Sequence, residues 1–432
     1  WGEEAVQART TEHPLQPFSR RYFEATDGPT GAKLFTHAHE WRDMHTSEKE
    51  QTVQSEKALG PDLVHEMAVP AFTPDPAVPL TLRVLTDALR HPVKAFFKRR
   101  LGVDFGREDD ITPDEEPFGV DGLTTYGMLR DALAAVPPDA TLAHAVGAAH
   151  ATLGRLQRSG ALPMGAMGDL ATASLTAPLT QMLVAWFEVQ RAHTQPAERL
   201  RVTHSSGDVV LQDWVDGLWC ADASDQGAPP LPPFMPPQPQ TETQTPIPDH
   251  AQTEALLEGQ PCCDGPRVWL GREVSRLVGK PATRDKPAEL RADKLLGVWL
   301  RCLVLSAFDA EPAMRPNHHA VVVARDATLW VTPQPPAEAR DTLDRLLAVW
   351  LQSMQAPLPL PPKTALKWLA DRGDGHVTRE CYEGGYQQTG EGEDPFWQRM
   401  YPDFEALTAC GAFETLADTV YAPLQHWVNT CI

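Results

Sequence analysis

A proline-rich stretch places the strongest constraint on how this chain can fold. Nine prolines fall within residues 228–248. Proline fixes φ and has no backbone N–H to donate, so neither a helix nor an internal strand can run through such a stretch. We therefore predict a polyproline-like or disordered insertion at about residues 222–250, with regular elements on either side of it.

Helical periodicity dominates the chain from about residue 80 to this insertion. Apolar residues recur with helical spacing from Leu82 to Val93, and His91-Pro92 should interrupt that first helix. Further helices are expected at residues 95–101, from Tyr126 through Leu133, at 139–158 and at 177–193.

Two predicted hairpins supply most of the strand signal. Residues 199–204 and 209–219 flank the turn-forming tetrapeptide Ser205-Ser206-Gly207-Asp208, and residues 320–324 and 328–332 flank Arg325-Asp326. A strand candidate at residues 267–270 and a long amphipathic helix at about 287–307 lie between the two hairpins. The expected fold class is therefore α/β (mixed α+β), with a small central sheet flanked by many helices.

The formal net charge of −20 limits what this chain can bind by itself. Such a charge repels a phosphate backbone at long range, which counts against a free-standing nucleic-acid-binding module. Any DNA contact should come from local basic clusters or from partner subunits that share a channel.

Cysteine usage and the apolar runs indicate the compartment. The seven cysteines contain no Cys-x-x-Cys pair, which indicates neither a zinc ribbon nor a disulfide framework and fits a reducing cytoplasm. The longest apolar run, residues 295–308, is short and carries Arg301, so a buried helix explains it better than a membrane span. The chain begins at Trp1 rather than at methionine, which we interpret as the start of a fragment.

Two basic clusters are candidate DNA contacts. The first interleaves cations with phenyl rings, a mixture that can combine phosphate contact with base stacking, and consists of Lys94, Phe96, Phe97, Lys98, Arg99 and Arg100. An amphipathic helix with its phenylalanines inward is the favoured alternative. The second cluster runs from Arg267 to Lys294 and includes Arg272 and Arg276. Nearby acidic residues partly cancel it, so a solvated face explains it equally well.

Other candidate sites are weak. His37, His39 and His45 lie in a polar stretch without a cysteine at ligand spacing, so we interpret them as solvated histidines, and His318-His319 likewise. No phosphate-binding loop is present, since Gly279-Lys280 is followed by proline. We therefore expect neither a metal site nor ATP binding in this chain.

Several stretches, taken together and in order, form a pattern that spreads over nearly the whole chain. They are His13-Pro14-Leu15-Gln16-Pro17-Phe18-Ser19 with Arg21-Tyr22-Phe23, Leu34-Phe35-Thr36 with Glu40-Trp41, residues 91–103, Glu115-Glu116-Pro117-Phe118 with Asp121-Gly122-Leu123 and Tyr126, Leu162-Pro163-Met164-Gly165, Trp214-Val215-Asp216-Gly217-Leu218, residues 357–363, and Gly392-Glu393-Asp394-Pro395. This pattern resembles the RecC family, the gamma subunits of exodeoxyribonuclease V.

The resemblance implies a non-catalytic subunit of the RecBCD helicase–nuclease, which processes DNA ends for double-strand break repair and recombination. Such a subunit would hold RecB-like and RecD-like partners, help split duplex DNA and channel single strands in the cytoplasm. Residues 1–75 would form the end of a helicase-like region and connector. Residues 76–432 would form an inactive PD-(D/E)XK nuclease-like domain. Magnesium and ATP would belong to the partner subunits.

Asp216 is the one candidate for a remnant of nuclease chemistry. The family pattern places the first metal-binding Asp of such a nuclease here, and an acidic-x-Lys triplet should follow on a nearby strand. None of the ten lysines has Asp or Glu two residues before it, and the strand candidate at 267–270 has no carboxylate. We therefore expect an inactive site in which Asp216 stabilises the turn at Gly217. The alternative is an active Mg²⁺-dependent nuclease that uses Asp216 with an atypical partner.

Overall fold

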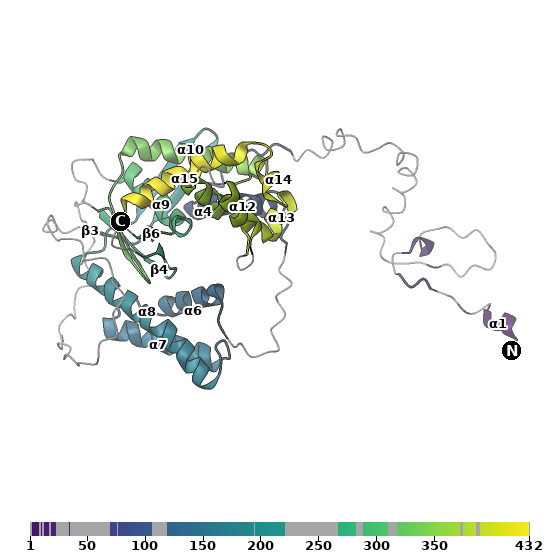
Figure 1. The fold of residues 1–432 in the computed structure, drawn as a ribbon, viewed down its shortest axis with the longest axis horizontal. Coiled ribbons are helices and arrows are strands. Elements are labelled where there is room, and N and C mark those ends of the chain that lie inside the picture. Colours follow the sequence, from purple (N-terminus) through teal and green to yellow (C-terminus); the bar gives the residue numbers. More distant parts are fainter. Residues whose placement is uncertain are drawn as a thin grey trace. The chain divides into compact units, whose positions relative to one another are not determined.

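The computed structural model divides the chain into two compact units, Trp1–Pro70 and Ala71–Ile432 (Figure 1). The structure describes residues 2–7, 10, 13–16, 19–22, 34 and 70 of the first unit, and residues 71–75, 77–105, 119–193, 195–220, 267–281, 288–309, 318–371, 375–385 and 389–431 of the second. The first unit contains helix α1 (Glu3–Gln7) and the 3-10 turn η1 (Arg20–Tyr22). The predicted boundary near residue 75 stays a prediction, and the proline-rich insertion and His37, His39 and His45 lie outside the described residues.

A four-stranded sheet forms the centre of the second unit. Its strands are β3 (Leu218–Cys220), β4 (Arg267–Glu273), β7 (Ala320–Ala324) and β8 (Thr328–Val331), in the order β3-β4-β7-β8. Strands β4 and β7 are parallel and the other neighbours are antiparallel. The parallel pair needs a crossover connection, and helix α9 (Ala292–Phe308) lies in that connection.

Smaller strand pairs lie beside this sheet. Strands β1 (Leu200–Ser206) and β2 (Val209–Val215) form an antiparallel hairpin, and β5 (Val278–Lys280) pairs with β6 (Glu289–Leu290). A single bridge joins Leu80 to Leu211 on the hairpin.

The two faces of the central sheet bury different hydrophobic clusters, because successive side chains along a strand point to opposite faces. Val268, Leu270 and Val321 pack with apolar residues of three helices, α6 (Gly122–Ala134), α7 (Leu142–Arg158) and α8 (Gly165–Ala192). Trp269 and Val322 belong instead to the larger core that includes α9, α10 (Pro336–Gln355) and α15 (Ala412–Thr430). The sheet is thus sandwiched between two helical layers.

The remaining helices complete the second unit. They are α4 (Leu82–Arg90), α5 (Pro92–Ala95), the π-helix η3 (Phe96–Arg100), α11 (Pro362–Ala370), α12 (Gly375–Glu383), the 3-10 turn η6 (Glu391–Glu393), α13 (Pro395–Met400) and α14 (Phe404–Thr408). The partly buried Glu391 carboxylate accepts hydrogen bonds from the backbone N–H groups of Lys363 and Thr364, and so satisfies free donors at the start of α11.

Both predicted hairpins are confirmed, and several predicted bounds are wrong. The strand expected at 209–219 breaks at residues 216–217, where Gly217 has a φ of +76°. The helix expected from residue 177 begins at Gly165, and the helix expected from about residue 287 begins at Ala292 because β6 precedes it.

Two side chains also differ from what the sequence indicated. Cys220 is disulfide-bonded, although the cysteine pattern indicated no disulfide framework. His319 is 4% exposed, so it is not a solvated histidine.

Helix α8 is unusually apolar for its position. By length and composition alone it is the one described helix that matches a membrane span, which is weak evidence by itself. Several apolar side chains near its start, including Met167 and Leu170, are exposed.

Candidate functional site beside Asp216

Asp216 lies at the junction between the hairpin and the central sheet. The positive φ of Gly217 turns the chain between β2 and β3, and the Gly217 carbonyl accepts a hydrogen bond from the Leu270 N–H at 3.0 Å. Leu218 is paired with Trp269 in antiparallel register. The pairing begins at Leu218; if its register were continued by two residues, Asp216 would lie opposite Gly271 on β4.

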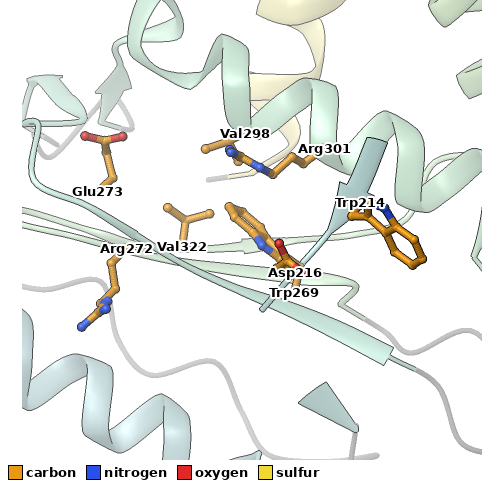
Figure 2. Close-up of a pocket in the computed structure, with 8 residues that line it drawn as sticks. All are labelled: Trp214, Asp216, Trp269, Arg272, Glu273, Val298, Arg301 and Val322. Atoms are coloured by element: carbon orange, nitrogen blue, oxygen red, sulfur yellow. The ribbon is translucent and has the colours of Figure 1, made fainter. Parts of the chain in front are cut away.

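A cavity of about 280 Å³ opens beside this junction (Figure 2). It is lined by Trp214, Asp216, Trp269, Arg272, Glu273, Val298, Arg301 and Val322. The lining side chains come from β2, the β2–β3 connection, β4, α9 and β7. Figure 2 shows the Arg301 side chain reaching from α9 over the Trp269 indole, with Asp216 beside the same ring.

The Trp269 indole lies across Gly271 and fills the space above it. A Cβ atom added to Gly271 would lie 2.4 Å from Cη2 of Trp269 and less than 3.0 Å from two further ring carbons. The Arg301 guanidinium lies over the same indole, 5.4 Å from the ring centroid. Position 271 therefore has no room for any side chain while this ring stays in place.

Glu273 is a second carboxylate in the pocket, and the expectation that this strand has none is wrong. Strand β4 continues three residues past its predicted end at Leu270, because residues 271–273 pair with β7. One Glu273 oxygen accepts a hydrogen bond from the Ser275 N–H at 2.9 Å. No lysine lines this cavity. The described part of the chain contains no group of three or more His, Cys, Asp or Glu side chains placed to hold a metal ion.

Arginine–tryptophan contacts surround the site. The guanidinium groups of Arg199 and Arg201 lie 4.1 and 5.8 Å from the ring centroid of Trp214, which remains 42% exposed. Arg272 points to the other face of β4, where it lies 5.0 Å from the centroid of Trp186. Burial there lowers the pKa of Arg272. All the arginine–tryptophan contacts within the described residues therefore involve β1, β2, β4 or the helices packed on β4.

The first basic cluster does not present its rings as an exposed platform. Phe96 is 6% exposed, and Phe97 packs 5.1 Å from Phe105 and 6.0 Å from Phe396. The Lys98 ammonium forms an ion pair with Asp104 at 2.5 Å. Phe96 and Phe97 thus pack against other side chains of the protein, as expected for the alternative of an amphipathic helix with its phenylalanines inward.

The cations of this first cluster are also engaged with the protein. The Lys94 ammonium lies 5.5 Å above the Phe396 ring, and the Arg100 guanidinium lies 5.7 Å from the Phe72 ring. Contact of Lys94, Lys98, Arg99 and Arg100 with DNA stays a prediction.

Acidic residues pair with much of the second basic cluster. Arg267 forms an ion pair with Asp309, Lys280 with Glu289 at 2.8 Å, and Arg291 with Asp293 at 3.4 Å. Within the described residues, Arg272 and Arg276 have no carboxylate partner within 4.0 Å. These two arginines, both named from the sequence, are the members of the cluster among the described residues that form no ion pair.

Sequence reasoning found Asp216 but missed Trp214, Trp269, Gly271 and Arg301. Trp214 stands two residues before Asp216 and was visible as an aromatic residue in the family-like stretch. Nothing local marks Trp269 or Arg301, because their roles depend on how α9 packs against β4.

Comparison with known proteins identifies the family. Residues 77–373 match the RecC C-terminal domain. The chain is 22% identical over 346 residues to the RecBCD enzyme subunit RecC of Escherichia coli (strain K12), which covers 76% of this chain and 24% of that protein. It is 26% identical over 405 residues to the RecBCD enzyme subunit RecC of Mycobacterium tuberculosis (strain CDC 1551 / Oshkosh), which covers 90% of this chain and 29% of that protein. The matched segment spans less than a third of either relative. Since the family match covers more than half of its length, this chain belongs to the RecC family.

Proposed function

We propose that this chain is a non-catalytic scaffold and DNA-guiding part of a RecBCD-type helicase–nuclease, acting in double-strand break repair and recombination. Membership of the RecC family supports this proposal, and both relatives carry the name of a RecBCD enzyme subunit. Its partners would be RecB-like and RecD-like subunits, with duplex ends and single strands of DNA. The complex would work in the cytoplasm, and the magnesium ions and ATP that it uses would bind to the partner subunits.

The second unit would be a nuclease-like domain of the PD-(D/E)XK type without a working active site. Such a nuclease holds Mg²⁺ between an Asp on one strand and the acid of an acidic-x-Lys triplet on the next strand. Asp216 lies opposite Gly271 when the β3–β4 register is continued. The triplet positions would then be residues 271–273, which are Gly, Arg and Glu. The acid is replaced by glycine and the lysine by glutamate.

The Trp269 ring is the observation that carries this proposal. Its carbons occupy the space directly above Gly271. Position 271, which should carry the carboxylate that faces Asp216, is therefore a glycine with no room for a side chain. The Arg301 guanidinium over that indole adds a positive charge to the lining of the same pocket as Asp216. A fixed positive charge in the pocket disfavours binding of a cation there.

The second candidate function is an active Mg²⁺-dependent nuclease that uses Asp216 with an atypical partner. Glu273 favours it, because it lines the same cavity as Asp216. Two carboxylates in one pocket can hold a divalent cation. Figure 2 shows the two side chains on different sides of Trp269 and Val322, an arrangement that supports the inactive site instead.

A nuclease assay separates the two candidates. The purified chain is incubated with linear duplex and single-stranded DNA in the presence of Mg²⁺ or Mn²⁺. We expect no degradation by the wild-type chain or by Asp216→Ala. Degradation that disappears in Asp216→Ala, and persists in the matched control Asp208→Ala in the β1–β2 turn, would establish a nuclease activity. It would contradict the hypothesis that this site is inactive.

An assembly assay tests the scaffold role directly. The chain should co-purify with RecB-like and RecD-like subunits from the same source. Charge reversal at Lys98, Arg99 and Arg100 should weaken DNA binding by the assembled complex. Failure to assemble would contradict the scaffold proposal, and unchanged DNA binding would leave the first basic cluster as an ordinary solvated surface.

A further inference from the structure

The pocket beside Asp216 keeps positive charge and an exposed indole although the chain as a whole carries a net charge of −20. Three arginines and one tryptophan, which we call the rim residues, lie at or beside it: Trp214 and Arg301 line the pocket, and Arg199 and Arg201 lie against the Trp214 ring. None of the three arginines has a carboxylate within 4.0 Å in the part of the chain that the structure describes. Each lies instead against an indole ring.

This combination matches what single-stranded nucleic acid requires. Proteins that hold single strands use arginines along the backbone and aromatic rings on which unpaired bases stack. Trp214 can act as such a ring, because 42% of its surface is exposed beside two guanidinium groups. Arg301 lies on the α9 side of the same pocket. Phosphates on either side of a stacked base would therefore meet positive charge.

The size and the acidic side chains of the pocket point to a base rather than a phosphate inside it. A cavity of about 280 Å³ lies near the small end of ligand sites, which suits one planar ring system. Asp216 is exposed and makes no hydrogen bond or ion pair within the described residues. A free carboxylate accepts hydrogen bonds from the exocyclic amino group of a base, as Asp and Glu do with cytosine N4.

We propose that this pocket holds one unpaired base of a DNA single strand, with Trp214 as the stacking surface, Arg199, Arg201 and Arg301 as phosphate contacts and Asp216 as the acceptor for an exocyclic amino group. In this proposal, the pocket that corresponds to a nuclease active site binds the strand and does not cleave it. This inference rests on the proposed DNA-guiding function and names the surface that would perform it.

The test uses the whole chain and a short single strand that contains one central 2-aminopurine, whose fluorescence falls when it stacks on an indole. We expect saturable quenching at about 0.1 M salt. Trp214→Ala should raise Kd about tenfold and remove most of the quenching, whereas Trp214→Phe should keep much of both. Arg301→Ala should raise Kd and reduce the slope of log K against log salt concentration by about 0.7. Arg130→Ala, an exposed arginine paired with Asp131, is the matched control and should leave both quantities unchanged.

Base preference provides a second readout. Strands with adenine or cytosine at the central position should bind more tightly than strands with thymine, which has no exocyclic amino group. Asp216→Asn should reduce that preference by about fivefold to tenfold, since a neutral amide oxygen accepts a weaker hydrogen bond than a carboxylate does. An equal loss of affinity for all strands in Asp216→Asn would contradict the role of Asp216 as a hydrogen-bond acceptor.

Three results would overturn the proposal. They are the absence of saturable binding by the wild-type chain, equal affinity of wild type and Trp214→Ala, and loss of partner assembly rather than of DNA binding in the rim variants. The last would make the pocket a protein interface.

The two proposals fail separately. Normal assembly with unchanged DNA affinity in the rim variants would remove the base site and leave the scaffold. DNA binding that depends on Trp214, in a chain that does not assemble with partners, would support the base site and contradict the scaffold role.

Discussion

Adding one methyl group at Gly271 tests the central structural claim, that the Trp269 ring closes the site. The new Cβ of Gly271→Ala would lie 2.4 Å from a ring carbon, where real Cβ atoms are essentially never found. Either the 8% exposed indole or the β4 backbone must move, and overpacking of this kind costs about 1–3 kcal/mol. Urea unfolding followed by circular dichroism measures the loss without relying on tryptophan fluorescence.

A double-mutant cycle shows whether the indole causes that loss. Trp269→Ala alone should cost about 3–5 kcal/mol, because it removes a large buried ring. Once the ring is absent, Gly271→Ala should stabilise the strand by about 0.5–1 kcal/mol, since glycine is unfavourable inside a strand. The two changes should therefore be coupled by about 2 kcal/mol, within the range for residues in contact.

A matched glycine in open space controls for the intrinsic effect of the substitution. Gly127 lies in α6 with nothing within 4 Å of an added Cβ, so Gly127→Ala should stabilise the chain by up to about 1 kcal/mol. Equal effects of Gly271→Ala in the wild-type and Trp269→Ala backgrounds would refute the claim. A neutral Gly271→Ala in the wild-type chain would refute it as well.

Two further predictions concern hydrogen bonds in the helical layer. Tyr401 donates to the Pro357 carbonyl at 2.7 Å, and burial raises the pKa of Tyr401 to about 12. Its contribution is therefore present below about pH 10 and lost as the pH rises toward 12, so Tyr401→Phe should cost about 1 kcal/mol at pH 7 and flatten the alkaline loss of stability seen by urea unfolding. At Asp394, burial alone would raise the pKa, but the hydrogen bond and charge of His91 and the backbone donors lower it overall. Asp394→Ala should cost about 1 kcal/mol at pH 7, and its difference from wild type should begin to shrink below about pH 4 and continue to shrink as the pH falls through the lowered pKa; a difference that stays constant from pH 7 to pH 2 would contradict this assignment.

The hairpins were predictable because local chemistry decides them. Ser205-Ser206-Gly207-Asp208 provides the turn, and β-branched and aromatic residues flank it, so no distant contact is needed. The start of α8 was missed because residues 165–176 are mostly small and lack a helical apolar pattern. The end of β4 was missed because Gly271 weakens the strand signal, and its pairing with β7 joins residues some 50 positions apart.

The site was predictable in part for the same reason. Counting lysines was enough to predict that the acidic-x-Lys triplet is missing, since the triplet is a local pattern. The sequence pointed to Phe96 and Phe97 as stacking residues, but tertiary packing places both in contact with other phenylalanines. The same packing leaves Trp214 exposed between two arginines. Local composition could therefore suggest stacking residues, but whether an aromatic ring is packed inside or exposed depends on tertiary contacts.

The net charge of −20 is compatible with a strand-guiding pocket because electrostatic range is short in the cell. At physiological ionic strength the screening length is about 8 Å, so acids farther than this from the rim residues contribute little to the field at the pocket. Arg301 lines the pocket, and Arg199 and Arg201 lie against its Trp214, all without carboxylate partners among the described residues, so the local field there should be positive. The long-range repulsion then disfavours binding of DNA that approaches from solution, whereas a strand delivered by partner subunits meets only the local charge. Lowering the salt should therefore strengthen binding of free DNA to the isolated chain by less than the local attraction alone predicts, because repulsion from the net charge also grows. It should strengthen the contact of a strand already held in the complex more fully.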